Sequence, residues 1–356
     1  MWWKHKTDKF LRGMAKVMAK TVKLADIAAI VNVSTVTVSK ALSDQKGVSE
    51  EMRARIKQLA KEMGYQTPTA ARLSSNKRTY NIGVLISEIY FDQTQSFYWQ
   101  MYQSVATKAV SKECFTLLEV LSMQNEKEMI LPKLLQEEKI DGLIIIGMLS
   151  SEYLSLIERN IRVPYICLDF YDRKHEFDAV ITDNFYGMYK LVNYLFEMGH
   201  KKIAYVGTLL STNSITDRYM GYYKAMLEHG QEVPADYVID DRSKDTRARC
   251  INYDFVLPKD MPTAFACNND VTAIDLIGYL KQKGYRVPED ISIVGFDNYQ
   301  VPGRGDLDIT TYEVDIKEMA RKTINNLLKK IVGEHYKKGI TTVEGHMVIK
   351  TSVKKL

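Results

Sequence analysis

From Tyr80 onward, short apolar runs alternate with stretches whose apolar residues follow a helical period, and no other feature constrains the fold of this chain as strongly. A run that is apolar at every position is typical of a parallel strand, because helices cover both faces of a parallel sheet. The alternation therefore predicts a doubly wound α/β fold with parallel sheets. The apolar runs are IGVLI at 82–86, FTLLEV at 115–120, GLIIIG at 142–147, YICLD at 165–169, AVIT at 179–182, IAYVG at 203–207, AFAC at 264–267 and ISIVG at 291–295.

The size of this α/β part indicates two lobes. It spans roughly 275 residues, which exceeds what one hydrophobic core usually organises. Ligands of open α/β sheets bind beyond the carboxyl ends of the strands, so we expect a site between the lobes. The segment HMVIKTSVKKL at 346–356 is predicted to be the last strand.

The segment Lys23–Leu42 predicts two short helices joined by a tight turn. The first helix has apolar residues at i, i+3, i+4 and i+7, namely Leu24, Ile27, Ala28 and Val31. Ser34 then supplies an N-cap for a second helix, which starts at Thr35. The outer face of that helix is small, polar and basic, and consists of Thr35, Val36, Ser39 and Lys40. This pattern is typical of a helix-turn-helix, whose second helix enters the DNA major groove; an ordinary helical hairpin stays open as the alternative for this stretch alone.

A third helix is predicted after Ser49, which is a good N-cap, and Gly64 ends it. Thr67 and Pro68 can then begin one further short helix. About two helical turns are marginal alone in water, so we expect this segment to be ordered only when something binds it, as a hinge would be. A plain linker is the alternative.

The charge is distributed unevenly along the chain. Residues 1–79 carry 16 Lys and Arg against 6 Asp and Glu, whereas residues 80–356 carry 33 against 38. A basic N-terminal block suits a polyanion such as DNA.

Several classes of function find no support in the sequence. The four cysteines form no C-x-x-C pair and the six histidines form no H-x-x-x-H pair, so we expect no metal site and no cofactor. The motifs G-x-S-x-G, G-x-x-x-x-G-K-[ST], H-E-x-x-H and G-x-G-x-x-G are missing, so we expect no enzyme.

Without a membrane span or a convincing signal peptide, we expect a cytoplasmic protein. We also expect residues 1–17 to be an upstream extension, with Met18 as the start of the native chain.

From about Val22 to the C-terminus, the chain resembles the LacI/GalR (lactose-repressor) family of bacterial transcription regulators. Beyond the predicted helix-turn-helix, the motifs that carry the resemblance are Asp183-Asn184 with Gly187, Gly199-His200-Lys201-Lys202-Ile203-Ala204, Arg218 with Gly221-Tyr222, Pro262-Thr263-Ala264, Asn269-Asp270 with Ala273, Gly284 with Val287-Pro288-Glu289-Asp290, Gly295-Phe296-Asp297 and Thr310-Thr311. Each motif is weak alone, and their order along the chain makes the resemblance specific.

The resemblance implies an N-terminal helix-turn-helix domain (22–66) after an extension (1–21). A hinge and linker (67–79) then lead to a two-lobed sensor like the type I periplasmic-binding proteins (80–356), in which the chain crosses between lobes near 183 and 310–345. It also implies a homodimer that binds a pseudo-palindromic operator and represses carbohydrate-utilisation genes. A sugar-binding protein without DNA function, cytosolic or exported, is the alternative.

The resemblance also assigns DNA-contacting residues. Thr35, Val36, Ser39 and Lys40 match base-reading positions, while Ser34 and Thr37 match phosphate contacts. Arg72 and Leu73 match the hinge, where a leucine wedges into the minor groove. Here the chain departs from the family pattern, because Leu73 follows Arg72 directly where the family has one residue between them.

The same resemblance assigns an effector site in the sensor. Phe97 and Tyr98 match an aromatic pair at the mouth of the cleft, and the polar positions that face the effector are Arg218, Asn269, Asp270 and Asp297. Carboxylates and Arg hydrogen-bond hydroxyl groups, and aromatic rings pack on sugar faces, so a carbohydrate effector is implied. Two alternatives stay open: Asp270 as a helix cap, and the aromatic pair as core.

Overall fold

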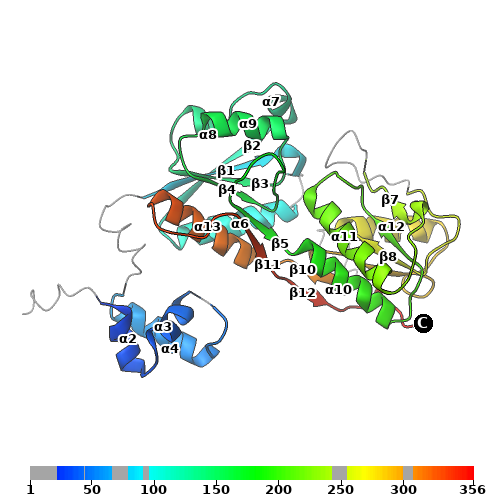
Figure 1. Cartoon of the computed structure of the whole chain (residues 1–356), viewed down its shortest axis with the longest axis horizontal. Coiled ribbons are helices and arrows are strands. Elements are labelled where there is room, and N and C mark those ends of the chain that lie inside the picture. The colour runs from blue at the N-terminus through cyan, green and yellow to red at the C-terminus, as the bar shows by residue number, and fades with distance from the viewer. Residues whose placement is uncertain (1–21, 44, 66–78, 91–95, 243–254, 300–307) are drawn as a thin grey trace, which may run out of the picture. The chain divides into compact units, whose positions relative to one another are not determined.

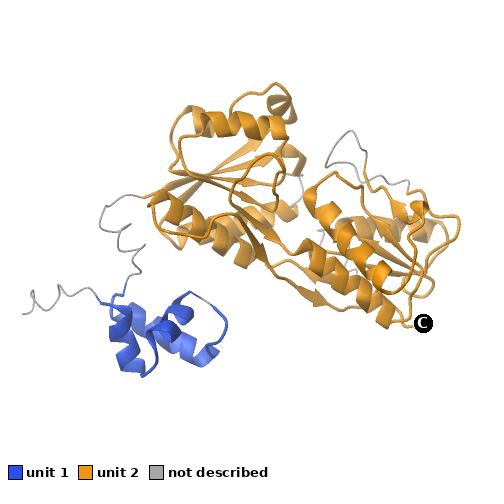
Figure 2. Cartoon of the chain, viewed as in Figure 1, with its two compact units in different colours: residues 1–78 blue, residues 79–356 orange. Residues whose placement is uncertain are grey.

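The computed structural model describes residues 22–43, 45–65, 79–90, 96–242, 255–299 and 308–356. The chain forms two compact units, Met1–Arg78 and Thr79–Leu356, which are coloured separately in Figure 2. Arg72 and Leu73 lie outside the described residues, as does the predicted hinge up to residue 78.

The first unit contains the three predicted helices, which are confirmed as α2 (Leu24–Val31), α3 (Thr35–Leu42) and α4 (Glu50–Glu62). Both predicted N-caps are present, since Ser34 accepts a hydrogen bond from the Thr37 amide and Ser49 accepts one from the Met52 amide. The turn between α2 and α3 uses Asn32 in the left-handed conformation (φ 54°). The small core consists of Ile27, Ala28, Val31, Val38, Ala41, Ile56 and Ala60.

The second unit begins with a six-stranded sheet in the order β11-β5-β4-β3-β1-β2, and all of its strand pairs are parallel. Its strands are β1 (Asn81–Ser87), β2 (Phe115–Leu121), β3 (Gly142–Ile146), β4 (Tyr165–Leu168), β5 (Ala179–Thr182) and β11 (Ile340–Val343). α8 (Lys133–Gln136) and α9 (Ser151–Asn160) lie on one face of this sheet (Figure 1). α6 (Phe97–Val110) and α13 (Ile316–Ile331) lie on the other face. This sheet and its helices form the first lobe.

The second lobe contains a parallel four-stranded sheet in the order β7-β6-β8-β9. The strands are β6 (Ile203–Val206), β7 (Val238–Ile239), β8 (Ala264–Cys267) and β9 (Ser292–Val294). α10 (Asn184–Glu197) and α11 (Asn213–Glu228) pack against each other on this lobe, and α12 (Asp270–Gln282) follows β8 (Figure 1). The remaining short helices of the second unit are η1 (Glu88–Tyr90), α7 (Met123–Lys127) and η2 (Ala235–Tyr237).

The chain passes between the lobes three times. It leaves the first sheet after β5 and enters the second lobe at α10. It returns through β10 (Thr311–Glu313) to α13 and β11, and then leaves again through β12 (His346–Val348), which pairs antiparallel with β10. The first lobe is therefore assembled from both ends of the second unit.

Two sequence expectations about strands are wrong. The run at 115–120 was expected to be buried on both faces, but β2 is an edge strand and Phe115 is 63% exposed. The last strand was expected to cover 346–356, but β12 ends at Val348. Beyond that point Ser352 accepts the Ile293 amide and donates from its hydroxyl to the Ile293 carbonyl, so the segment contacts β9 outside the described ladders.

No single helix in the described ranges is long and apolar enough to cross a membrane. α2 and α3 reach the required length and composition only as a pair, and the pair is bent by 104°.

Candidate functional site

The outer face of α3 is presented to solvent as the sequence predicts. Thr35, Val36, Ser39 and Lys40 are all exposed, and Val36 is 60% exposed although it is apolar. The inner residues Val38 and Ala41 are fully buried, which fixes the rotation of the helix about its axis.

The beginning of α3 is held by a local hydrogen-bond pair. The Ser34 hydroxyl accepts the Thr37 amide at 3.1 Å, and the two side-chain hydroxyls lie 2.9 Å apart. Arg53 on α4 donates to the Gln45 carbonyl at 2.8 Å, which fastens the loop that follows α3. The face is therefore set by packing and caps before any partner binds.

The second site is a polar cluster between the lobes, built around Arg218 of α11. Its guanidinium donates to the Asn184 side chain at 2.8 Å, to the Asn268 carbonyl at 2.5 Å and to Asp297 Oδ1 at 3.0 Å. It also lies 3.8 Å from the centre of the Phe296 ring. Arg218 is only 5% exposed, so these contacts replace the water that it loses.

Asp297 lies just beyond β9, at the carboxyl edge of the second sheet. Burial raises the pKa of its carboxyl to about 6, although the neighbouring Arg218 opposes the rise. Its backbone has φ 100°, an unusual value for a side-chain-bearing residue, and its amide donates to the Tyr312 carbonyl at 2.8 Å. The Asp297 carboxylate is thus fixed beside Arg218 by backbone and side chain together.

Asp169 faces this cluster from the first lobe and was not predicted. It follows β4 directly, and Tyr98 on α6 donates to its Oδ2 at 3.0 Å. Burial raises the pKa of Asp169 to about 7; Arg218 opposes the rise and Asp297 adds to it. The usable signal in the sequence was the position of Asp169, a polar residue directly after a buried strand.

The structure brings together some of the predicted effector residues and gives two others a structural role. Tyr98, Arg218 and Asp297 belong to the interlobe cluster through the contacts above, and Phe97 packs edge-on against Tyr98 with ring centres 5.5 Å apart. Asn269 is the N-cap of α12, because its side chain accepts the Thr272 amide at 2.8 Å. The alternative that Asp270 caps this helix is therefore wrong.

Asp270 instead supports the segment that carries Asp297. Its Oδ2 accepts the Tyr299 amide at 2.8 Å, and the residue is 3% exposed. Burial raises the pKa of this carboxyl to about 8, and the charge of Asp297 adds to the rise.

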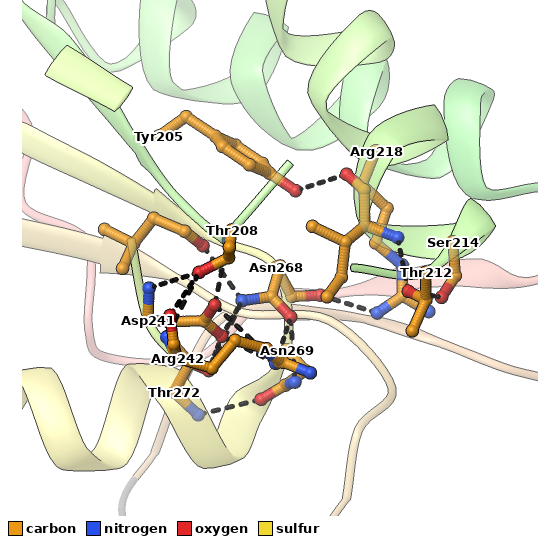
Figure 3. Close-up of polar contacts among 12 residues, drawn as sticks. Tyr205, Thr208, Thr212, Ser214, Arg218, Asp241, Arg242, Asn268, Asn269 and Thr272 are labelled. Atoms are coloured by element: carbon orange, nitrogen blue, oxygen red, sulfur yellow. Dashed lines mark hydrogen bonds and ion pairs between the residues drawn. The ribbon is translucent and has the colours of Figure 1, made fainter. Parts of the chain in front are cut away.

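A buried network braces Asn268, the residue whose carbonyl receives Arg218 (Figure 3). Asp241 accepts hydrogen bonds from Asn268 at 2.7 Å, from the Thr272 hydroxyl at 2.9 Å and from the Thr208 amide at 2.8 Å. Arg242 donates to both oxygens of the same carboxylate, at 3.0 and 2.6 Å. Burial acts to raise the pKa of Asp241, but Arg242 and these hydrogen bonds outweigh it and lower the pKa to about 2. The sequence offered no signal for this network, because its members come from three segments that are far apart in the chain.

Tyr171 connects the two lobes at the edge of the cluster. From the loop after β4 its hydroxyl donates to the Asp217 carboxylate on α11, at 2.8 Å to one oxygen and 3.0 Å to the other. Its amide donates to the Asn213 side chain at 3.4 Å. A pocket of about 150 Å³ adjoins this contact and is lined by Met148, Tyr171, Leu210, Thr212, Asn213, Thr216 and Asp217.

Comparison with known proteins gives two matching family models. Residues 23–68 match the model of bacterial regulatory proteins of the lacI family, and residues 192–353 match that of the periplasmic binding protein-like domain. The first match covers α2, α3 and α4, and the second includes Arg218, Asp241, Asp270 and Asp297.

Curated relatives match over nearly their whole length. The chain is 27% identical over 335 residues to the HTH-type transcriptional repressor PurR of Aliivibrio salmonicida, covering 94% of this chain and 99% of the relative. It is also 27% identical over 343 residues to the HTH-type transcriptional repressor CytR of Escherichia coli K12, with 96% and 99% covered.

Solved structures share the fold. A complex of the transcriptional regulator CelR with cellobiose has a TM-score of 0.65 at 22% identity and covers 93% of this chain and 99% of the other. The lac repressor dimer bound to operator and the anti-inducer ONPF has a TM-score of 0.62 at 21% identity, with 94% and 100% covered. With both family models in order along one chain and repressors matched from end to end, this protein belongs to the lacI family of bacterial regulatory proteins and is a DNA-binding transcriptional regulator.

Proposed function

We propose that the protein is a homodimeric cytoplasmic repressor that binds a pseudo-palindromic operator and responds to a small effector, by preference a carbohydrate, bound between the sensor lobes. The observation that carries this proposal is the fixed and exposed face of α3, with Thr35, Val36, Ser39 and Lys40 pointing to solvent from a well-formed three-helix core. The relatives named above as repressors support it.

On DNA, each residue of the α3 face has a chemical role that suits its position. Lys40 can donate to guanine O6 or N7, and Val36 can contact a thymine methyl group. Thr35 and Ser39 can hydrogen-bond base edges, while Ser34 and Thr37 contact phosphate and fix the register. Arg72 and Leu73 would extend the interface into the minor groove from the hinge at 67–79.

In the sensor, the effector site uses Phe97, Tyr98, Arg218, Asn269 and Asp297, and Asp270 holds the segment of Asp297 in place. The solved complex of CelR with cellobiose supports a carbohydrate ligand for this fold. The effector changes operator affinity only through its different affinities for the lobe arrangements that bind and release DNA.

Electrophoretic mobility shift of the full chain tests DNA binding, with operators first enriched from random duplexes by repeated selection. We expect a retarded complex whose affinity falls steeply with salt, because phosphate contacts release counterions. Lys40→Ala should weaken binding roughly 5- to 160-fold, because a specific base contact contributes about 1–3 kcal/mol.

Lys61→Ala is the matched control, because it removes the same charge from an exposed position near the end of α4. It should bind the selected duplex nearly as well as the original protein. Equal losses in the two variants would mean that general charge, and not the α3 face, drives binding. Failure to select any duplex at low salt would contradict the proposed function.

A further inference from the structure

The two guanidinium groups of the interlobe cluster are already neutralised by carboxylates of the same lobe. Arg218 donates to Asp297 at 3.0 Å, and Arg242 is bound by both oxygens of Asp241. Each pair is nearly buried, with 6% and 9% of the two arginine side chains exposed. Because these pairs hold their charges internally, neither arginine offers an uncompensated positive charge to a ligand.

The Asp169 carboxylate is in the opposite situation. Its Oδ2 accepts the Tyr98 hydroxyl, but its Oδ1 is buried and accepts no hydrogen bond from any described residue. The residue is 7% exposed. A buried oxygen without a partner costs free energy, so this position is suited to receive an N–H or O–H group from outside the chain.

We propose, building on the function above, that the interlobe site takes an effector that donates a hydrogen bond to Asp169 and carries no negative charge. Neutral polyols and primary amines meet this requirement, whereas phosphorylated and acidic analogues do not. An anionic group in this cluster would meet the carboxylates of Asp169 and Asp297, while the nearby guanidinium groups are already paired.

The ionisation of Asp169 determines whether ligand affinity rises or falls with pH, which can be measured. The ionisable groups around this carboxyl are Tyr98 on α6, Tyr90 on η1, Arg218 on α11 and Asp297 after β9. Burial and the charge of Asp297 raise its pKa to about 7, although Arg218 and the hydrogen bond from Tyr98 oppose the rise. A donor or an ammonium group binds the ionised carboxylate better than the protonated one. The affinity of a neutral donor, whose own charge does not change in this interval, should therefore rise about tenfold between pH 6 and pH 8, whereas an anionic ligand should bind more weakly over the same interval.

Thermal melting of the full chain with matched ligand sets tests the proposal. One set is glucose, glucosamine, glucose 6-phosphate and gluconate, and another is cellobiose, cellobionate and cellobiose 6-phosphate; adenosine, cytidine and their monophosphates form a third. The affinity of each stabilising ligand is then measured calorimetrically at pH 6 and pH 8. Asp169→Asn keeps the shape of the side chain and removes the charge, and Glu176→Gln, at an exposed position in the same loop, is its control.

We expect a neutral or amine ligand to stabilise the protein, its acidic and phosphorylated partners to have no effect, and Asp169→Asn alone to remove the pH dependence. Stabilisation by a phosphorylated or acidic member, or tighter binding at pH 6, overturns the proposal, and so does a panel without any Asp169-dependent shift. Selection of an operator is carried out with the full chain and no added ligand, so it measures DNA binding separately from ligand binding at this site. A negative result with the ligand panel therefore does not contradict the DNA-binding function. Likewise, a negative operator selection does not change the conclusion from the ligand panel.

Discussion

The same residue type shows opposite ionisation behaviour at different positions of the sensor. Asp169, Asp270 and Asp297 have raised pKa values of about 7, 8 and 6, because burial dominates and cationic partners only partly compensate. Asp241 has a pKa of about 2, because Arg242 and the hydrogen bonds of the network outweigh an equally deep burial. Asp297 is also paired with an arginine, but Asp241 accepts hydrogen bonds from Thr208, Asn268 and Thr272 in addition to both contacts from Arg242. The number of cationic and hydrogen-bonding contacts, and not depth, therefore decides which carboxylates resist ionisation.

The carboxyl groups with raised pKa values make the stability of the ligand-free protein depend on pH. In the unfolded chain these groups ionise near pH 4, but in the folded protein they keep their protons to about pH 6–8. Their contribution to stability is complete below pH 4 and is lost as pH rises through the folded pKa values. We expect Asp270→Asn to flatten the fall in melting temperature between pH 5 and pH 8.

The control for this experiment is Glu289→Gln, which removes a carboxylate from an exposed position in the same lobe. It should leave the pH profile of the melting temperature unchanged. A profile of Asp270→Asn that is parallel to that of the original protein would contradict the assigned cause.

At the scale of single elements, α3 shows how a short helix of only Thr35–Leu42 can be stable enough to present a face. Two helical turns are hardly stable by themselves, so the Ser34 cap and the core contacts of Val38 must stabilise the helix. Ser34→Ala should lower the free energy of unfolding of the first unit by about 1 kcal/mol.

Ser39→Ala is the matched control, because Ser39 is an exposed serine on the same helix and caps nothing. Circular dichroism melts of residues 22–65 would detect the difference if this segment folds alone, and hydrogen exchange of the α3 amides in the full chain would detect it in either case. Equal exchange rates in both variants would mean that the cap is dispensable.

The sequence predicted the helices and strands that are determined by a local pattern of residues, and missed those that depend on distant segments. The helices of the first unit and the central strands were predicted, because caps and fully apolar runs are local signals. The edge position of β2 and the short strands β7, β10 and β11 depend on pairing with distant segments, which periodicity does not report. The same limit applies to the site. Arg218 and Asp297 came from motifs of the resembling family, and Asp169 could have been found from its place directly after a buried strand. Asp241 and Arg242 became visible only when three-dimensional contacts joined them to Asn268.

At the scale of the whole sensor, direct contacts between the lobes lie near the effector cluster. The Tyr171 hydroxyl bound to Asp217 is one of them, and it lies beside the described pocket. Tyr171→Phe removes this bond and keeps the ring, so it should cost about 1 kcal/mol of stability in the arrangement described here. We expect faster hydrogen exchange in residues 169–175 and in the first turn of α11.

Tyr186→Phe, at an exposed position on α10, is the control that removes a tyrosine hydroxyl elsewhere in the second unit. If exchange near Tyr171 stays unchanged while α11 also remains protected, the contact does not hold the lobes together. An operator affinity that changes with Tyr171→Phe but not with Tyr186→Phe would connect this contact to DNA binding.

The threefold passage of the chain between the lobes also sets the order in which the protein can mature on the ribosome. Five strands of the first sheet are complete when Thr182 has been made, but β11 and the covering helix α13 come only near the end of the chain. Synthesis of the ~160 residues in between takes roughly ten to thirty seconds at bacterial rates. During that interval β5 has an unpaired edge and the sheet lacks one of its covering helices, so the nascent first lobe is the part of this protein that most needs a chaperone.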